Sequence, residues 1–334
     1  AMKNVIGMGN ALTDILIRLE TDDLLDAFNL KRGGMHLVDT DLQHRIAERA
    51  AALPRTLSLG GSASNTIRAA ARLGTPTGYI GKVGRDETGD FFERAMREQG
   101  IDPHIFRSDR PSGRCISLVS ADGERTMCTS LGAALEMTRD ELDARIFDGY
   151  DCLYIEGYLV QDHELIAHAV RTARSLGMKV ALDLASFNVV EENLSFLQEL
   201  TDECVDILFA NEQEAEAFTG LSDPLEALES IARRCSLAVV KVGTQGAYIR
   251  REGRTEHVGI LAEARRVDTT GAGDFYAAGF LSGLCKGLSM KQCGTIGAIA
   301  AGKVIEVTGT TFPEAIWQQI DRMVAEVERG ELLF

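Results

Sequence analysis

The chemically most suggestive stretch of the sequence runs from Asp268 to Asp274 and reads DTTGAGD. Its glycines let the backbone turn sharply and present N–H groups without obstruction by side chains. A helical pattern, 275–280, follows directly, and the positive end of a helix dipole favours a bound phosphate. We therefore predict an anion-binding turn at Gly271, Ala272 and Gly273, with Asp274 placed to accept a proton from an attacking hydroxyl. The alternative is a plain turn followed by a helix cap.

Polar residues near two early turns could hold the hydroxyl groups of a sugar. Asn10 and Asp14 follow the predicted first strand, while Gly60 and Gly61 open a predicted helix that carries Asn65. Paired glycines allow the backbone to approach a ligand closely, and an asparagine amide both donates and accepts hydrogen bonds. Such residues are also common in ordinary turns and helix caps, so this alternative stays open.

Two later groups follow predicted strands, at the edge where open α/β sheets bind ligands. Asn211 and Glu214 come directly after the strand at 206–210, although an acidic first helical turn favoured by the helix dipole is the alternative. A second group follows the strand at 238–242 and could line a nucleotide pocket, or form a plain hairpin turn. Its members are Lys241, Gly243, Thr244 and Gly246.

Short β-branched runs alternate with longer helical patterns along the chain. The predicted strands are 4–8, 77–80, 152–155, 179–184, 206–210 and 238–242. The predicted helices are 62–73, 88–99, 163–176, 212–218, 225–234, 275–285 and 290–304. This alternation predicts one α/β domain over residues 1–334, with a mostly parallel sheet and helices on both faces.

Two segments, 12–38 and 112–131, contain strand-like residues with no crossover helix. We expect them to pair into a small, discontinuous lid, with irregular surface loops as the alternative.

Composition narrows the range of partners. The formal net charge is −15, and no basic stripe is present, which argues against a nucleic-acid or membrane-surface partner. Seven cysteines are scattered without a C-x-x-C pair, so we expect free thiols and a cytoplasmic protein. The six histidines lack the spacing of a metal site.

Together these motifs resemble those of the PfkB, or ribokinase-like, carbohydrate kinase family. The region 60–86 is similar to the family's N-terminal signature, and 268–280 is similar to its C-terminal signature. Asn211-x-x-Glu214 matches a third family motif. The resemblance spans nearly the whole chain. It implies the ribokinase-like three-layer fold, with a mostly parallel central sheet and a small β-sheet lid.

The resemblance also implies ATP-dependent phosphoryl transfer to an alcohol group. Asp274 would be the catalytic base, and the N–H groups of Gly271, Ala272 and Gly273 would form the anion hole. Asn211 and Glu214 would position Mg²⁺ on the ATP phosphates through water. The sugar hydroxyls would be held by Asn10, Asp14, Gly61 and Asn65.

Two further roles follow from the same resemblance. Arg125, on the predicted lid, would neutralise phosphate charge when the site closes, a solvated surface arginine being the alternative. Asp268 and Thr270 resemble positions of a monovalent-cation site, so activation by K⁺ is a further expectation.

Within the family, the segments 7–14, 124–127, 131–134 and 308–314 are similar to adenosine kinases. This similarity favours a nucleoside, adenosine first, whose base would lie in an apolar slot lined by Phe187, Met35 and Leu131. Asp183 departs from the hydroxyl-rich segment of adenosine kinases by adding a charge, so a sugar kinase acting on ribose, fructose or a keto-deoxy sugar acid remains the main alternative.

Two other classes fit the sequence less well. A non-catalytic relative has no need of Asp274 and its glycine turn. A dinucleotide-dependent oxidoreductase needs a third glycine where Leu12 follows Gly7 and Gly9. Monomer and homodimer are both compatible with the sequence.

Overall fold

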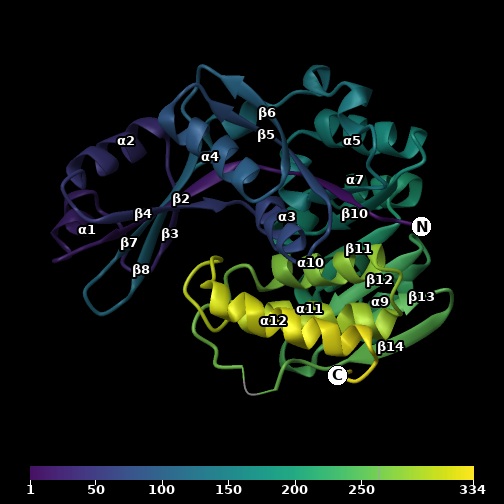
Figure 1. The fold of residues 1–334 in the computed structure, drawn as a ribbon. Helices are drawn as coiled ribbons and strands as arrows, with labels where there is room; N and C mark the ends of the chain where they lie inside the picture. The colour runs from purple at the N-terminus through teal and green to yellow at the C-terminus, as the bar shows by residue number, and fades with distance from the viewer. Residues whose placement is uncertain (263) are drawn as a thin grey trace.

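A nine-stranded sheet runs through the larger part of the molecule (Figure 1). The computed structural model describes residues 1–262 and 264–334. Neighbouring strands are parallel except at one edge, where β12, β13 and β14 form an antiparallel meander. In spatial order the strands are β14 (Arg254–Val258), β13 (Ala247–Arg251), β12 (Leu237–Lys241), β11 (Ile207–Asn211), β10 (Lys179–Asp183), β9 (Cys152–Glu156), β1 (Val5–Met8), β5 (Thr77–Gly84) and β6 (Asp102–Ser108).

Helices cover both faces of this sheet, which is the predicted three-layer arrangement. One face carries α5 (His163–Ser175), α7 (Leu194–Cys204), α8 (Glu212–Thr219) and α9 (Pro224–Ala232). The other carries α3 (Ser62–Arg72), α4 (Glu87–Glu98), α10 (Ala272–Cys285) and α11 (Met290–Val304), with α12 (Glu314–Glu328) packed outside them.

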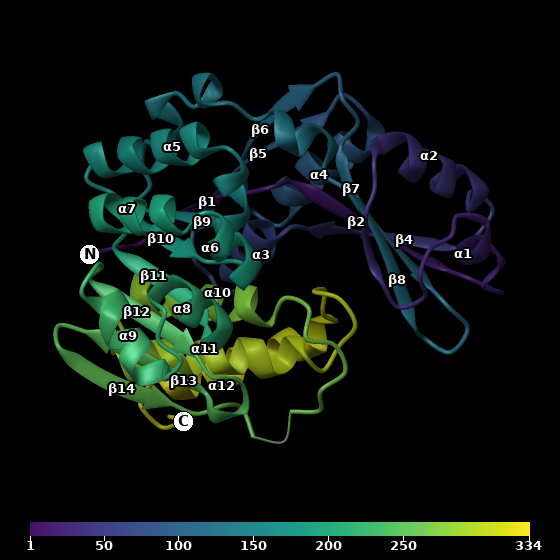
Figure 2. The same cartoon turned by 180° about the vertical axis from the view of Figure 1, so that it is seen from behind.

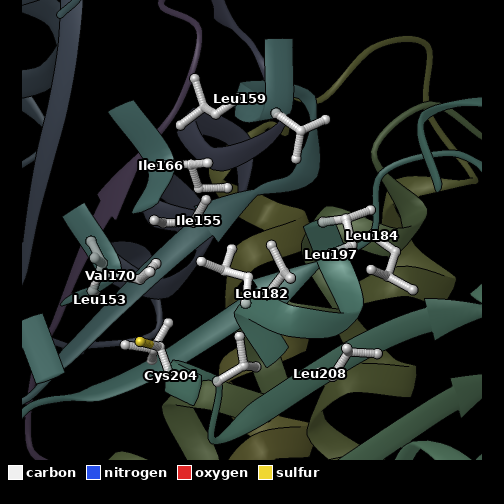
Figure 3. Packing of buried hydrophobic residues seen from close by; sticks show 14 of the residues in the cluster. Leu153, Ile155, Leu159, Ile166, Val170, Leu182, Leu184, Leu197, Cys204 and Leu208 are labelled. Carbon is white, nitrogen blue, oxygen red and sulfur yellow. The ribbon is translucent and has the colours of Figure 1, made fainter. Parts of the chain in front are cut away.

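The core explains why the central strands are almost continuously apolar. Figure 3 shows Leu153 and Ile155 of β9 beside Leu182 of β10, packed against Ile166 of α5 and Leu197 of α7. Strands buried on both faces carry no polar alternation, because neither face meets water.

Short elements complete the large domain. They are α6 (Phe187–Glu192) and the 3₁₀ helices η1 (Gly132–Glu136), η2 (Arg139–Glu141), η3 (Ala144–Phe147), η4 (Gly157–Gln161) and η5 (Gly243–Gln245). No helix in the described part of the chain is long and apolar enough to cross a membrane.

A second, five-stranded sheet projects from the large domain (Figures 1 and 2). Its order is β3 (Met35–Leu37), β8 (Arg125–Ser130), β7 (Gly113–Val119), β2 (Leu12–Arg18) and β4 (Arg55–Gly60). Two helices, α1 (Asp23–Ala27) and α2 (Thr40–Arg49), cover one face and bury Ile17 and Leu118. Four of its strands lie in the segments predicted as a lid, whereas β4 lies outside both.

The order of strands in the large sheet creates a crevice. From β1 the chain passes to β5 and β6 on one side, and later to β9, β10, β11 and β12 on the other. Where the strand order reverses, helices leave in opposite directions and the carboxyl ends of the strands are left uncovered. This edge of the sheet is the natural place for a binding site.

Candidate functional site

Polar side chains gather at the carboxyl ends of neighbouring strands. Asn10 follows β1, while Glu156, Asp183, Asn211 and Lys241 are the last residues of β9, β10, β11 and β12. Because these strands are parallel neighbours, the five residues follow one another along a single edge of the sheet. Asn10, Asn211 and Lys241 were predicted site residues. Asp183 was identified only as a charge that adenosine kinases lack in this segment, and Glu156 was not predicted.

Asp274 lies in the first turn of α10 and is held by the first turn of α3. The Ser62 hydroxyl donates to Asp274 Oδ1 at 2.7 Å, and Asn65 Nδ2 donates to Oδ2 at 3.0 Å. Burial raises the pKa of Asp274 to about 6, and these two hydrogen bonds oppose the rise. A carboxylate with this pKa and a fixed orientation is ionised near neutrality and ready to accept a proton.

The turn before α10 presents backbone N–H groups beside Asp274. Gly271 caps the helix with φ +78°, a conformation that glycine adopts without strain. Among the described residues, the Gly271 and Gly273 N–H groups have no protein acceptor, whereas Ala272 N–H donates to Thr269 O at 3.2 Å. Two of the three predicted donors are therefore free for an anion in this conformation.

Glu156 is a buried carboxyl that sequence reasoning missed. Its Oε1 accepts the N–H groups of Asn10 and Ala63, each at 3.1 Å, and so joins β1 to α3. Burial raises the pKa of Glu156 to about 8, with the charges of Asp274 and Asp183 acting in the same direction. Glu156 is therefore mostly protonated near neutrality and can donate a hydrogen bond.

The two glycines at the start of α3 are required by close packing. A Cβ on Gly60 would lie 2.3 Å from Asp14 Oδ1, and one on Gly61, whose φ is +89°, would lie 2.4 Å from Asn10 O. The junction between the small sheet and α3 therefore packs directly against two predicted substrate contacts, Asp14 and Asn10. Burial raises the pKa of Asp14 to about 6, although the charges of Arg68 and Arg125 oppose the rise.

Asn65 differs from its predicted role. Besides donating to Asp274, its amide accepts from Arg68 Nη2 at 2.7 Å and from the Thr310 hydroxyl at 3.3 Å. Both ends of the amide therefore have protein partners. In this conformation Asn65 orients the predicted base instead of facing a sugar hydroxyl.

Arg125 joins the small sheet to the anion-binding turn. Its Nη1 lies 2.7 Å from Asp268 Oδ2, which also accepts from Gly309 N at 3.0 Å. Asp268 Oδ1 accepts from both the N–H and the hydroxyl of Thr270, at 2.9 and 2.7 Å. Although burial alone would raise the pKa of Asp268, these hydrogen bonds and the charge of Arg125 hold it below its usual value.

The predicted monovalent-cation site at Asp268 and Thr270 gains no support from these contacts, because protein donors already occupy both oxygens of the Asp268 carboxylate. It stays a prediction.

Residues 35–317 match the family described as pfkB family carbohydrate kinase. The chain belongs to this family. It is similar to the structure of adenosine kinase from Sinorhizobium meliloti, with 34% identity, a TM-score of 0.82, and coverage of 96% of this chain and 99% of that one. A probable sugar kinase from Rhizobium etli CFN 42 gives 32% identity and a TM-score of 0.82, covering 99% of both chains. Adenosine kinase 2 of Arabidopsis thaliana is 26% identical over 332 residues, which are 93% of this chain and 96% of the relative.

These comparisons confirm the predicted family and the ribokinase-like fold. This PfkB kinase is an ATP-dependent phosphotransferase that acts on a carbohydrate or nucleoside. Adenosine kinases and sugar kinases both stand among its relatives, so its acceptor is a matter for proposal.

The kinase's Asn211 and Glu214 form a reciprocal helix cap. Asn211 Oδ1 accepts from Glu214 N and Glu214 Oε2 accepts from Asn211 N, both at 2.8 Å. Burial raises the pKa of Glu214 to about 7, helped by the charge of Asp183 and opposed by that of Lys241. Its Oε1 has no protein partner in 1–262 and 264–334, so this oxygen can accept from a water of a hydrated Mg²⁺. The residues thus fit the predicted indirect role, which stays a proposal.

The predicted nucleotide-binding group forms the hairpin between β12 and β13. Gly243 and Gly246 have φ values of +59° and +94°, and a Cβ on Gly246 would lie 2.0 Å from Val258 O. Thr244 is exposed in the turn. The hairpin alternative was therefore correct for the backbone, and it leaves the nucleotide contacts of this kinase as a proposal.

Proposed function

We propose that this kinase transfers the γ-phosphoryl group of ATP to a primary hydroxyl of a nucleoside, with adenosine as the favoured acceptor. The observation that carries the proposal is an apolar surface on one face of the small sheet. Met35 and Leu37 are 78% and 77% exposed, and adjoining exposed apolar side chains are typical of a surface that binds a ligand or partner.

Strand register supports the proposal, because these side chains share a face of the small sheet with Asp14 and Arg125. Residues paired across neighbouring strands share a face, and faces alternate along a strand. One row across the sheet reads Asp14, Cys115, Thr129 and Leu37. The next reads Leu16, Ser117, Met127 and Met35, and Arg125 lies two residues from Met127 on the same face.

This face turns toward the anion-binding turn, because Arg125 reaches Asp268 from it. A ligand whose phosphorylated end meets Asp274 can therefore extend along the face toward Leu37 and Met35. A nucleoside base needs such an apolar surface, whereas a free sugar needs additional hydroxyl partners. Phe187 follows β10 and Tyr158 follows β9, so both lie near the carboxyl edge of the large sheet. The two residues are 39% and 42% exposed, and their aromatic rings can contribute to the slot for the base.

The proposed reaction uses Asp274 as the base. The acceptor O–H bond breaks and its proton passes to the Asp274 carboxylate, while the acceptor oxygen forms a bond to the γ-phosphorus. The bond from phosphorus to the β,γ-bridging oxygen breaks and ADP leaves. The N–H groups of Gly271 and Gly273 stabilise the phosphoryl charge, and Asn211 and Glu214 would hold the waters of the Mg²⁺ that neutralises the ATP phosphates.

A sugar acceptor is the second candidate. It is supported by the similarity to the probable sugar kinase and by Asp183 and Glu156, whose carboxyl groups can bind hydroxyls. Under this candidate the base, the anion hole and the proton transfer are unchanged.

The first test is ADP release with ATP and Mg²⁺ across nucleosides and free sugars, with and without K⁺. Turnover of adenosine without turnover of ribose or fructose is expected. Preference for a free sugar would contradict the proposed acceptor. Asp274→Asn should abolish turnover and keep ATP binding, and near-normal turnover in that variant would remove Asp274 as the base.

The second test addresses the apolar face. Leu37→Ser should raise KM for the nucleoside more than it lowers kcat, because the base is remote from the reacting oxygen. Leu57→Ser is the matched control, since Leu57 is 40% exposed and its pairing with Ile15 places it on the opposite face. Equal effects of the two substitutions would show that the face does not bind the base.

A further inference from the structure

Asp183 is fixed by the backbone that follows it. It is 6% exposed at the end of β10, and its Oδ1 accepts from Ala185 N at 2.8 Å. Ala185 has a φ of +67°, a left-handed conformation that is strained for a residue with a Cβ. The strained turn directs the other carboxylate oxygen, Oδ2, toward the site.

That oxygen faces a lysine two strands away. Lys241 Nζ lies 3.7 Å from Asp183 Oδ2, across the end of β11, and the two side chains are only 17% and 8% exposed. The same ammonium would lie 3.0 Å from a Cβ on Gly273. Lys241 therefore lies beside the anion-binding turn, next to the residue that precedes Asp274.

The surroundings of Lys241 are strongly acidic. After burial, the negative charge of Asp183 also raises the pKa of both Asp274 and Glu214, and the charge of Asp274 adds to the rise at Glu214. The positive charge of Lys241 opposes both rises. A lysine side chain is flexible and could turn toward several of these carboxylates. Asp183, held by Ala185, gives it one preferred position.

We propose that Asp183 is a positioning residue, which holds the Lys241 ammonium beside Gly273 so that its charge stabilises the transferred phosphoryl group. This role rests on the proposed base and anion hole but not on the identity of the acceptor. Lys241 takes no part in the proton transfer. The acceptor's proton goes to Asp274, and Lys241 compensates the charge on the phosphoryl oxygens as the bond to ADP breaks.

A double-mutant cycle with Asp183→Asn, Lys241→Met and the combined variant tests this inference. Lys241→Met should lower kcat by about 100-fold, the scale of losing one preorganised donor to a developing charge. Asp183→Asn should lower kcat by about tenfold with little change in either KM, because the lysine remains but is no longer held. The combined variant should be no slower than Lys241→Met, since Asp183 acts through the lysine.

Independent, multiplicative losses in the combined variant would overturn the proposal and mean that Asp183 contacts the substrate itself. An undiminished kcat in Asp183→Asn would also overturn it. Lys241→Gln, which can still hydrogen-bond to Asp183, supplies a second cycle should Lys241→Met fail to fold.

Two further measurements test whether Lys241→Met lowers kcat through the lost charge beside Asp274 or through a general disturbance of the fold. Lys241→Met should move the acidic limb of the kcat profile to higher pH, because Asp274 loses a nearby positive charge. The groups that surround Asp274 are Ser62, Asn65, Arg68, Tyr154, Glu156, Tyr158, Asp183, Glu214 and Lys241. An unmoved limb would contradict the proposed position of the ammonium.

Lys179→Met is the matched control. Lys179 begins the strand that Asp183 ends and lies 3.2 Å from Asp206, so the variant breaks another lysine–aspartate pair at the far end of β10. It should leave kcat unchanged. If the wild type prefers a free sugar, the proposed acceptor is wrong, while the same cycle measured on that sugar still decides the role of Asp183.

Discussion

Replacing Ser62 with alanine tests how the proposed base is tuned. The Ser62 hydroxyl donates to Asp274 Oδ1 at 2.7 Å and opposes the effect of burial, which raises the pKa of Asp274 to about 6. A hydrogen bond to a charged group contributes about 1.5–3 kcal/mol, and about 1.4 kcal/mol corresponds to one pKa unit. Ser62→Ala should therefore raise the pKa of Asp274 by about one to two units.

The resulting loss of rate should depend on pH. At about pH 6.5, a rise of about 1.5 units lowers the ionised fraction of Asp274 from about three-quarters to about a tenth, so kcat should fall roughly eightfold. At about pH 9 the carboxyl is ionised in both proteins and the rates should converge. The assay is kcat for ADP release from about pH 5.5 to 9.

Ser64→Ala is the matched control for this series. The Ser64 hydroxyl is buried on the same helix and has no hydrogen-bond partner among the described residues. Its removal should leave the pH profile in place. The reasoning is refuted if Ser62→Ala loses the same factor at every pH, since Ser62 would then orient Asp274 without tuning it.

Three other perturbations test the surrounding structure. Glu156→Gln should flatten the dependence of the unfolding free energy on pH. The pKa of Glu156 is about 8 in the folded protein and lies above its ordinary value, so the protonated side chain favours the folded state. This contribution is complete below about pH 4.5 and is lost as the pH rises to about 8. Urea titrations across that range check this, and an unchanged slope contradicts it. Arg125→Ala should lower kcat more than it raises KM. Arg32→Ala, which breaks exposed ion pairs with Asp22 and Asp122 in a turn before β3, should change neither. Gly61→Ala should destabilise the fold more than Gly74→Ala. Both glycines have φ near +90°, but only the Cβ added at position 61 would clash, with the Asn10 carbonyl oxygen. Equal losses of stability in urea would mean that backbone strain accounts for the whole effect.

The alternation of strands and helices was enough to predict the large sheet. Its central strands and both helical layers follow from buried apolar runs and helical spacing, as β9 and α5 illustrate. The edge strands were missed because they are polar, and β6 also contains Pro103, which is tolerated at an edge. The omission of α12 has no such reason, since Ile320, Val324 and Val327 have helical spacing and are buried.

Only the site residues that belong to a local sequence motif could be predicted. Glycine-rich turns and strand ends pointed to Asp274 and Asn211, and the same rule applied to the strand at 152–155 would have found Glu156. No local pattern reveals that Ser62 and Asn65 hold Asp274, because those contacts join residues 212 and 209 positions apart. Likewise, the partner of Arg125 depends on how the small sheet lies over the turn before α10.

The large sequence separation of these contacts also has a consequence for folding during synthesis. A chain emerging from the ribosome presents the small sheet and α3 early, whereas Asp274 and Thr310, two of the three partners of Asn65, come only in the last fifth of the sequence. A domain generally folds as a unit, so the crevice and its base are completed together once α10 has been synthesised. Nascent chains that stop short of α10 carry no residue in the position of Asp274. Synthesis itself thus delays phosphoryl transfer until the chain is nearly complete.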